Sequence, residues 1–224
     1  MSINSYFVNG KRFGWGPGSA SLNPEKAHLL KNYSQSKCLD IGFGSGIYTE
    51  YLRNLGHEVV GIDNEKRFVQ LATKKYPEIE FVAGNALKLP FKKRQFDTAI
   101  AFDILEHVDD EAALEELFRV AKRVIFSVPL KNEKVLLRYG LSHAHYLDRT
   151  HRRAYSLKVI RQLINKKKSK TIYLEKSLPL SISGLLIEQL SGKNLFLEYL
   201  LKIILKPFLP EPPIFSTIFG VIER

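Results

Sequence analysis

Residues that could bind a nucleotide are concentrated in the first half of the chain. The segment Cys38–Gly46 runs from apolar residues through Asp40 into a loop with glycine at every second position. A strand, a glycine loop and a helix in this order bring backbone N–H groups close to a ligand. A dinucleotide site also needs a small residue where this chain has Ile47. The spacing therefore favours a nucleotide-type ligand without a pyrophosphate.

A second acidic residue follows a second apolar run, Glu58–Asp63. At the end of a parallel strand, the carboxylate of Asp63 can accept two hydrogen bonds from a ribose diol. Asp63 or Asn64 could also cap the helix expected at Glu65–Lys74. One residue can serve both purposes, so the two interpretations are compatible.

Further motifs follow at regular intervals. The chain reads Leu89-Pro90-Phe91, then Phe96-Asp97, then Leu105-Glu106-His107-Val108. Together with L-D-I-G-x-G-x-G, this series resembles the class I S-adenosylmethionine-dependent methyltransferases, and in particular their type-11 branch, over about residues 36–130. The resemblance implies an α/β, Rossmann-like fold with a mostly parallel seven-stranded sheet and helices on both faces. It also implies S-adenosylmethionine as the cofactor and S-adenosylhomocysteine as the product.

The resemblance also implies which residues hold the cofactor. They are Asp40, Gly42, Gly44, Gly46, Asp63, Asn85, Ala86 and Phe102. Asn85 stands where the family usually has an acid that contacts the adenine amino group. An amide oxygen can still accept from that amino group, and the amide NH2 can donate to a ring nitrogen. The alternative is an asparagine that only stabilises a turn.

Two histidines are the candidate catalytic residues. Methyl transfer from a sulfonium mainly requires alignment and the exclusion of water, and an oxygen or nitrogen acceptor can also need a base. His107 follows the expected fourth strand, although the pair Glu106-His107 could instead cap the helix Asp109–Val120. His151 lies in D-x-T-H-x-R-x-Y-S, which resembles a segment of the same branch. There His151, Arg152 and Tyr155 would face the acceptor or a lid, unless the segment is only a surface loop.

A metal site is not expected. His143, His145, Asp148 and His151 lie within one short segment and could bind a metal. Their spacing matches no established metal motif, and the segment is not clearly helical. We therefore expect no metal.

The composition limits the range of binding partners and substrates that can be expected. The 224 residues carry a net charge of +11, which attracts anionic lipid, nucleic acid or phosphorylated compounds. Enzymes that methylate exocyclic base amines need an Asn/Asp/Ser-Pro-Pro-aromatic tetrapeptide where this chain has Phe102–Leu105. Enzymes that methylate cytosine C5 need a nucleophilic cysteine after the fourth strand, but the only cysteine of this chain is Cys38. Neither of these two classes fits, so nucleic acid is not the expected substrate, and an RNA-directed enzyme is an alternative on charge alone. Without a signal-like amino terminus, the expected location is cytoplasmic, with peripheral membrane contact as an option.

The expected organisation is a single domain over residues 1–224. A leader with a helix covers 1–34, the cofactor-binding core covers 36–130, and an active-site loop covers 131–155. Residues 179–213 form an apolar helical insertion or lid. The oligomeric state is not predictable from the sequence.

The insertion contains an unusual helix pattern. Asn194, Glu198, Lys202 and Lys206 recur at every fourth residue, and the residues between them are apolar. A helix over this stretch has one narrow polar stripe. It could be buried under other elements, which is the first choice, form the wall of a site for an apolar substrate, or contact a membrane surface or a second copy.

The predicted function is methyl transfer to an oxygen, carbon or nitrogen atom of a small acceptor, which the apolar helix and the basic charge suggest is lipophilic or lipid-linked. The non-enzymatic alternative is a scaffold that binds S-adenosylmethionine without turnover. An NAD(P)-dependent oxidoreductase is disfavoured by Ile47 and by the later motifs.

Overall fold

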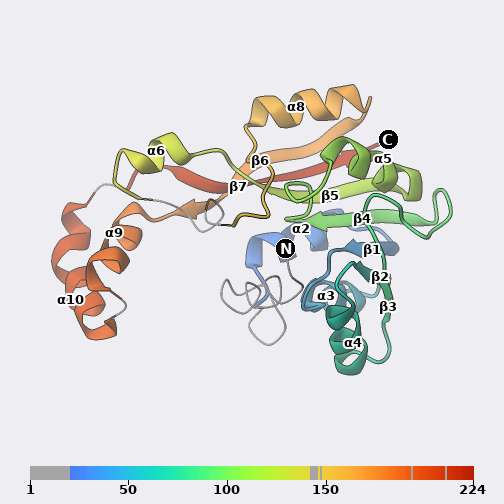
Figure 1. Ribbon diagram of the computed structural model, residues 1–224, viewed down its shortest axis with the longest axis horizontal. Helices are drawn as coiled ribbons and strands as arrows, with labels where there is room; N and C mark the ends of the chain where they lie inside the picture. Colours follow the sequence, from blue (N-terminus) through green and yellow to red (C-terminus); the bar gives the residue numbers. More distant parts are fainter. Residues whose placement is uncertain (1–20, 142–145, 147, 193, 210) are drawn as a thin grey trace.

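A computed structural model describes residues 21–141, 146, 148–192, 194–209 and 211–224. Its centre is one seven-stranded sheet in the order β3-β2-β1-β4-β5-β7-β6 (Figure 1). The strands are β1 Lys37–Ile41, β2 Glu58–Asp63, β3 Glu80–Ala83, β4 Phe96–Phe102, β5 Ala121–Pro129, β6 Lys170–Leu180 and β7 Ile214–Glu223. Strands β1 to β5 run parallel to one another, whereas β7 lies antiparallel between β5 and β6. The predicted mostly parallel sheet is confirmed.

Helices cover both faces of the sheet. They are α2 Pro24–Tyr33, α3 Ile47–Asn54, α4 Lys66–Lys75, α5 Asp110–Val120, α6 Glu133–Leu137, α8 Leu157–Lys166, α9 Ile182–Ser191 and α10 Leu195–Leu205, with a short 3-10 turn η1 at Lys206–Phe208. Leu114 of α5 and Ile160 of α8 belong to the apolar cluster on one face. Leu29 of α2 and Leu52 of α3 belong to the cluster on the other. Buried strands with apolar residues on both faces are typical of parallel sheets.

Side-chain caps define where several helices begin. Asn23 caps α2, Asp109 caps α5 and Ser156 caps α8, each accepting a hydrogen bond from a backbone N–H of the first turn. Such a bond satisfies a donor that the helix leaves unpaired. The cap of α4 is Glu65, whereas the sequence predicted it one or two residues earlier. Capping by Asp109 also means that the alternative role of Glu106-His107 as the cap of α5 is wrong.

The two α-helices α9 and α10, with η1, form an arm between β6 and β7, called here the α9–α10 arm (residues 182–208). In Figure 1 the arm lies at the end of the molecule opposite β1, β2 and β3. Ile182 packs with Leu136, Leu141 and Ile214 in a small apolar cluster at the base of the arm. The predicted helix after Asn194 is present, and Asn194 caps it by accepting from two backbone N–H groups.

The outer helix of the arm is exposed, which corrects the interpretation that it is buried under other elements. None of the residues of α10 is buried. Leu195 is 80% exposed, Phe196 is 72% exposed, and Phe208 of η1 is 86% exposed. The helical period predicted the polar stripe, and the helix packs along α9 and η1.

Parts of the predicted organisation are not described. Residues 1–20 of the leader, together with His143 and His145, lie outside the described residues. The division into leader, core, loop and insertion stays a prediction. Among the described helices, none combines the length and apolar character needed to cross a bilayer.

Candidate functional site

A cavity of about 530 Å³ opens at the carboxyl ends of β1, β2 and β4. Parallel α/β sheets place their ligands at this edge because the loops that follow the strands converge there. Of the residues predicted from the sequence, nine line the cavity: Asp40, Gly42, Gly44, Asp63, Asn85, Ala86, Phe102, His107 and His151. Gly46 lies outside the cavity wall. The structure thus brings both predicted histidines to the same cavity as the predicted cofactor residues.

The glycine loop has a conformation that side chains would disturb. Gly46 is the N-cap of α3 with φ +76°, and an added Cβ would lie 3.1 Å from Cε2 of Tyr76. Gly42 has φ +68°, and its Cβ would lie 2.0 Å from Cδ1 of Ile104. Positive φ is costly for residues with a Cβ. Gly46 therefore shapes the loop, while Gly42 also leaves room for the Ile104 side chain, which lines the cavity.

Asp63 ties the glycine loop to β2. Its Oδ2 accepts from the Gly44 N–H at 3.0 Å, and its Oδ1 accepts from the Glu65 N–H at 2.9 Å. Burial raises the pKa of Asp63 to about 6. Each carboxylate oxygen can accept a further bond, so the pair can still receive a diol. The bond from the Glu65 N–H means that Asp63 holds the residue that caps α4, although Asp63 is not the cap itself.

Asp40 and Asn85 also have internal partners. Asp40 is buried, and its Oδ2 accepts from Oγ1 of Thr49, at the start of α3, at 2.6 Å. Burial raises the pKa of Asp40 to about 6. Oδ1 of Asn85 accepts from the Leu87 N–H at 2.9 Å, which is the turn interaction considered from the sequence. Asn85 nevertheless lines the cavity, so the turn and a ligand contact are compatible.

The residues present fit S-adenosylmethionine. The cavity volume lies within the range of about 300–1,000 Å³ that is usual for small-molecule sites. A ribose can meet the Asp63 carboxylate, and the glycine loop leaves backbone surface open beside it. Phe102 and Ile62 offer apolar walls, and Asn85 offers a polar amide.

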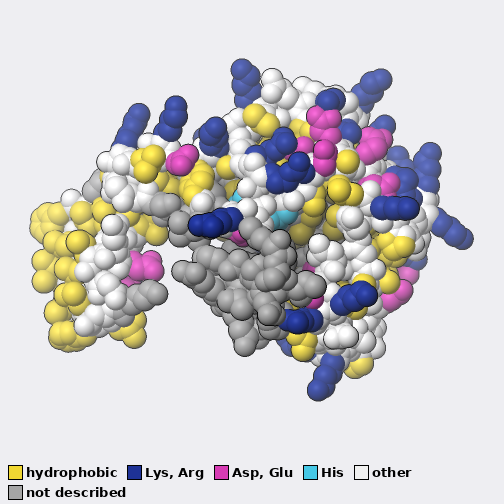
Figure 2. Space-filling model, in the orientation of Figure 1, with side chains coloured by type: hydrophobic (Ala, Val, Ile, Leu, Met, Phe, Trp, Pro, Cys, Tyr) yellow, Lys and Arg dark blue, Asp and Glu magenta, His cyan; other side chains and the backbone are white. Residues whose placement is uncertain are grey.

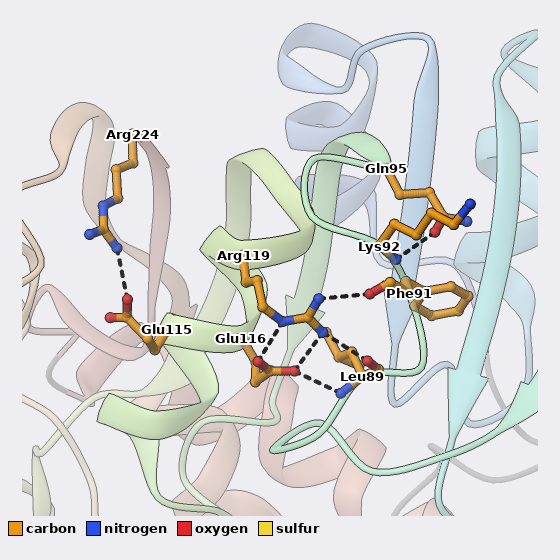
Figure 3. Close-up of polar contacts among 8 residues, drawn as sticks. All are labelled: Leu89, Phe91, Lys92, Gln95, Glu115, Glu116, Arg119 and Arg224. Atoms are coloured by element: carbon orange, nitrogen blue, oxygen red, sulfur yellow. Dashed lines mark hydrogen bonds and ion pairs between the residues drawn. The ribbon is translucent and has the colours of Figure 1, made fainter.

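The Leu89-Pro90-Phe91 motif is fixed by a polar network behind the cavity. Figure 3 shows the Arg119 guanidinium donating to the carbonyl oxygens of Leu89 and Phe91 and to Glu116. The Glu116 carboxylate in turn accepts from the Leu89 N–H at 2.8 Å. Bidentate contacts of this kind hold two segments in a set geometry. The motif thus positions the loop between β3 and β4, whose residues Asn85 and Ala86 line the cavity.

A buried lysine was not anticipated from the sequence. Nζ of Lys26, in α2, contacts Oδ2 of Asp103, whose Oδ1 accepts from Oγ of Ser127 at 2.6 Å. Burial opposes the charge on Lys26, but the Asp103 carboxylate together with Tyr48 and Glu106 outweighs burial and raises the pKa of Lys26 above its ordinary value. The Lys26 side chain is 11% exposed, and that of Asp103 is 50% exposed because it faces the cavity. Asp103 also has φ +56°, which is unusual for a residue with a side chain.

The two histidines meet in one edge-to-face pair. The ring centroids of His107 and His151 are 4.7 Å apart. Oγ1 of Thr150 lies 2.9 Å from Nδ1 of His107, and Oδ2 of Asp148 lies 3.7 Å from Nε2 of His151. Burial, with a contribution from His151, lowers the pKa of His107 below its ordinary value. His107 is therefore a neutral imidazole near neutral pH, which is the form of a base.

Glu106, beside the histidines, is one of the most buried charged residues described. It is 1% exposed, and its Oε2 accepts no hydrogen bond from the described residues. Burial raises the pKa of Glu106 well above its ordinary value. Its backbone oxygen accepts from the Arg152 N–H at 2.7 Å, which fastens the segment of His151 to the end of β4.

Tyr155 corrects another expectation. Instead of facing an acceptor, it is fully buried, and its hydroxyl contacts Oδ2 of Asp110 at 2.9 Å and the Leu105 oxygen at 3.1 Å. The buried Tyr155 side chain anchors the segment that carries His151 to Leu105 and to α5. The sequence could not separate this role from a site role, because an aromatic residue before a helix suits both.

Comparisons with known proteins agree with this geometry. Residues 39–124 match the family model described as a methyltransferase domain. A demethylmenaquinone methyltransferase of Paenarthrobacter aurescens is 36% identical over 87 residues, which are 38% of this chain and 34% of that protein. One from Thermotoga maritima is 34% identical over 98 residues, which are 42% of this chain and 43% of that protein. The match thus spans less than half the length of these curated relatives.

Solved structures extend the likeness over the whole fold. The magnesium protoporphyrin IX methyltransferase of Synechocystis PCC 6803, solved with bound SAH, superposes with a TM-score of 0.64 at 17% identity, covering 99% of this chain and 96% of that one. The YcgJ protein of Bacillus subtilis superposes with a TM-score of 0.62 at 20% identity, covering 90% of this chain and 99% of that one. At such identities the likeness concerns the fold.

Proposed function

We propose that this chain, which carries a class I S-adenosylmethionine-dependent methyltransferase domain, methylates an oxygen, carbon or nitrogen atom of a small lipophilic or lipid-linked acceptor. The observation that carries the proposal is the cavity in which the glycine loop, Asp63 and the pair His107–His151 meet. The names of the curated relatives, which refer to demethylmenaquinone, support a lipid-linked quinone as the first acceptor to test.

The binding half of the cavity has a role for each polar group. Asp63 would accept hydrogen bonds from the ribose hydroxyls, and Asn85 would bind the adenine edge. The backbone of Gly42 and Gly44 would lie along the ligand, because neither residue has a side chain. When bound, S-adenosylmethionine supplies an electrophilic methyl group on its sulfonium sulfur.

The acceptor half of the cavity is bordered by Asp103, His107 and His151. For a hydroxyl acceptor, a C–O bond forms, the C–S bond breaks, and a proton is released. The neutral His107 imidazole would take that proton, and Thr150 at its Nδ1 orients the ring. The aromatic wall of Phe102 and Tyr48, packed edge to face at 5.3 Å, would help to exclude water.

The α9–α10 arm supports a lipophilic acceptor. Figure 2 shows hydrophobic side chains gathered over the arm, while Lys and Arg side chains spread over the rest of this face. Leu195, Phe196 and Phe208 are strongly exposed, and an apolar surface bordered by basic residues suits the interface of an anionic membrane. Along the chain, the arm ends at Phe208, a few residues before Ser216 and Thr217, which line the cavity. We therefore propose that the acceptor enters the cavity from the side of the arm.

Calorimetric titration tests the cofactor half. S-adenosylmethionine and S-adenosylhomocysteine are titrated into the wild type, Asp63→Ala and Asp97→Ala, an exposed carboxylate outside the cavity wall. We expect micromolar binding in the wild type and in Asp97→Ala, and at least a tenfold loss in Asp63→Ala, because two charge-assisted hydrogen bonds are removed. Equal affinity in all three proteins would contradict the assignment. Binding without turnover on quinone, phenol or glycolipid acceptors would favour the scaffold alternative.

Vesicle flotation tests the arm. The wild type should float with anionic vesicles at low salt and less with zwitterionic ones, and Leu195→Glu combined with Phe196→Glu should weaken flotation. The matched control is Leu71→Glu on α4, an exposed leucine away from the arm. Equal flotation of both variants would refute the membrane contact. A concentration-dependent dimer in sedimentation, lost only in the arm variant, would replace it by contact between two copies.

A further inference from the structure

Three side chains that can each bind a metal meet at one wall of the cavity. Glu106, His107 and His151 offer ligand atoms that all lie within 4.8 Å of one another. We propose that these residues bind one divalent first-row transition-metal ion of the zinc type, with a further coordination position open to the cavity. The site joins the segment after β4 to a segment more than forty residues later in the chain. The spacing of residues within either segment therefore could not predict it.

Glu106 is the first argument for an ion. Its carboxyl group is almost completely buried, and Oε2 accepts no hydrogen bond from the described residues. An unpaired buried carboxylate is costly, and native structures nearly always provide it with a partner or a metal. A cation between Glu106 and the two imidazoles would supply that partner.

The surroundings of the histidines are the second argument. Oγ1 of Thr150 contacts Nδ1 of His107 at 2.9 Å, and it donates to Oδ1 of Asp148 at 2.6 Å. Oδ2 of Asp148 lies 3.7 Å from Nε2 of His151. Carboxylate and hydroxyl groups in this position orient metal-binding imidazoles in known sites. The bond from Arg152 N–H to the Glu106 oxygen holds the two segments together before any ion arrives.

The ligand set indicates the type of ion. Asp103 is excluded as a ligand, because Lys26 contacts its Oδ2 and Ser127 donates to its Oδ1. Two imidazoles and one carboxylate remain, a set that leaves a fourth position for water or substrate in catalytic zinc sites. Imidazole ligands favour zinc and its neighbours over magnesium and calcium.

The geometry requires a small closure. With bonds of about 2.1 Å, ligand atoms around a tetrahedral ion are about 3.4 Å apart. The present separations of up to 4.8 Å would therefore contract by up to about 1.4 Å, through side-chain rotations of Glu106 and His151. If the proposed function holds, the open position would take an acceptor oxygen such as an enol or phenol, whose pKa the ion would lower. With the ion bound, His107 would act as a ligand instead of as the base, and the acceptor proton would be released to water.

Metal titration of the full chain tests the site without using activity. Protein stripped with a chelator is titrated with Zn²⁺ by calorimetry and with Co²⁺ by visible spectroscopy, since the d–d bands of Co²⁺ report nitrogen and oxygen ligation. We expect one tightly bound ion per chain. Glu106→Gln and His151→Ala should each weaken binding by more than about 100-fold, the upper range for loss of an outer-shell partner.

A control variant separates this site from other histidines. His28→Ala removes a histidine of α2 whose ring contacts Asn32, and it should bind as the wild type does. Loss of binding in this control, or unchanged binding in both Glu106→Gln and His151→Ala, would overturn the proposal, as would a wild type that binds no ion tighter than millimolar.

Cofactor titration of the same variants keeps the two proposals distinguishable. His151→Ala should bind S-adenosylhomocysteine with the wild-type affinity, because Asp63 and the glycine loop are untouched. Zn²⁺ should raise the melting temperature of the wild type but not that of Glu106→Gln. If the ion binds as proposed while the cofactor does not, only the methyltransferase proposal fails.

Discussion

The pair of Lys26 and Asp103 gives the sharpest test of how the amino-terminal helix is held over the cavity. Lys26→Met keeps the length and most of the apolar stem but removes the charge. The Asp103 carboxylate then loses the ammonium that holds the pKa of that carboxyl low against burial. Because Asn23 and Lys26 both line the cavity, the effect should reach the ligand as well as the fold.

The size of the effect follows from the burial of the two partners. Breaking a fully buried ion pair costs about 3–5 kcal/mol, and a surface pair contributes about 0–1 kcal/mol. The Lys26 side chain is 11% exposed and that of Asp103 is 50% exposed, so we expect an intermediate loss of about 2 kcal/mol. For a domain of this size, that corresponds to a fall in melting temperature of about 4–8 °C.

Thermal unfolding of the wild type, Lys26→Met, Asp103→Asn and the double variant measures the coupling between the two residues. Lys31→Met, an exposed lysine of the same helix, is the matched control and should melt within about 1 °C of the wild type. The double variant Lys26→Met with Asp103→Asn should recover part of the loss, with a coupling energy of about 1–2 kcal/mol. A Lys26→Met protein that melts with the control would refute the reasoning, and so would fully additive losses.

Two further predictions concern the cofactor loop. Burial raises the pKa of Asp63 to about 6, and hydrogen bonding to a ribose diol needs the ionised carboxylate, so the affinity for S-adenosylhomocysteine should fall as the pH drops below about 6. In calorimetry, Asp63→Asn, which cannot titrate, should show a flatter dependence of affinity on pH. Parallel pH dependences in the two proteins would exclude Asp63 as the cause. Gly42→Ala should lower the melting temperature by about 2–4 °C through its positive φ and also weaken the ligand by displacing Ile104 into the cavity. Gly56→Ala, at φ +90° with open space around it, should melt lower with unchanged affinity, and equal affinities in both variants would contradict the role given to Ile104.

The convergence of the glycine loop and Asp63 at one cavity was predictable because the sequence signals are local. The strand that ends at Asp63 and the loop after Asp40 each carry their own signal of period, glycine and carboxylate. The sheet then brings their carboxyl ends to one edge regardless of other details. For the same reason the presence of a helix after Asn194 was predicted from its four-residue period.

Contacts between distant segments could not be read in this way. Lys26 and Asp103 are 77 residues apart, and nothing in the spacing of either distinguishes it from an exposed lysine or aspartate. The period of α10 likewise fixes which residues share a face but not whether another element covers them. Burial is decided by tertiary packing, and here the fold places the arm beyond the sheet.

The arm is inserted into a β-hairpin whose two strands remain paired up to its base. Leu180, the last residue of β6, pairs with Ile214, the first of β7, so the chain leaves and re-enters the sheet at adjacent points. Glu211 closes this junction by accepting from the Ile182 N–H and from the Ser181 and Ser183 hydroxyls. An insertion anchored in this way can be lengthened, replaced or lost without changing the register of any strand. The arm is therefore free to diverge independently, while the sheet keeps its connectivity.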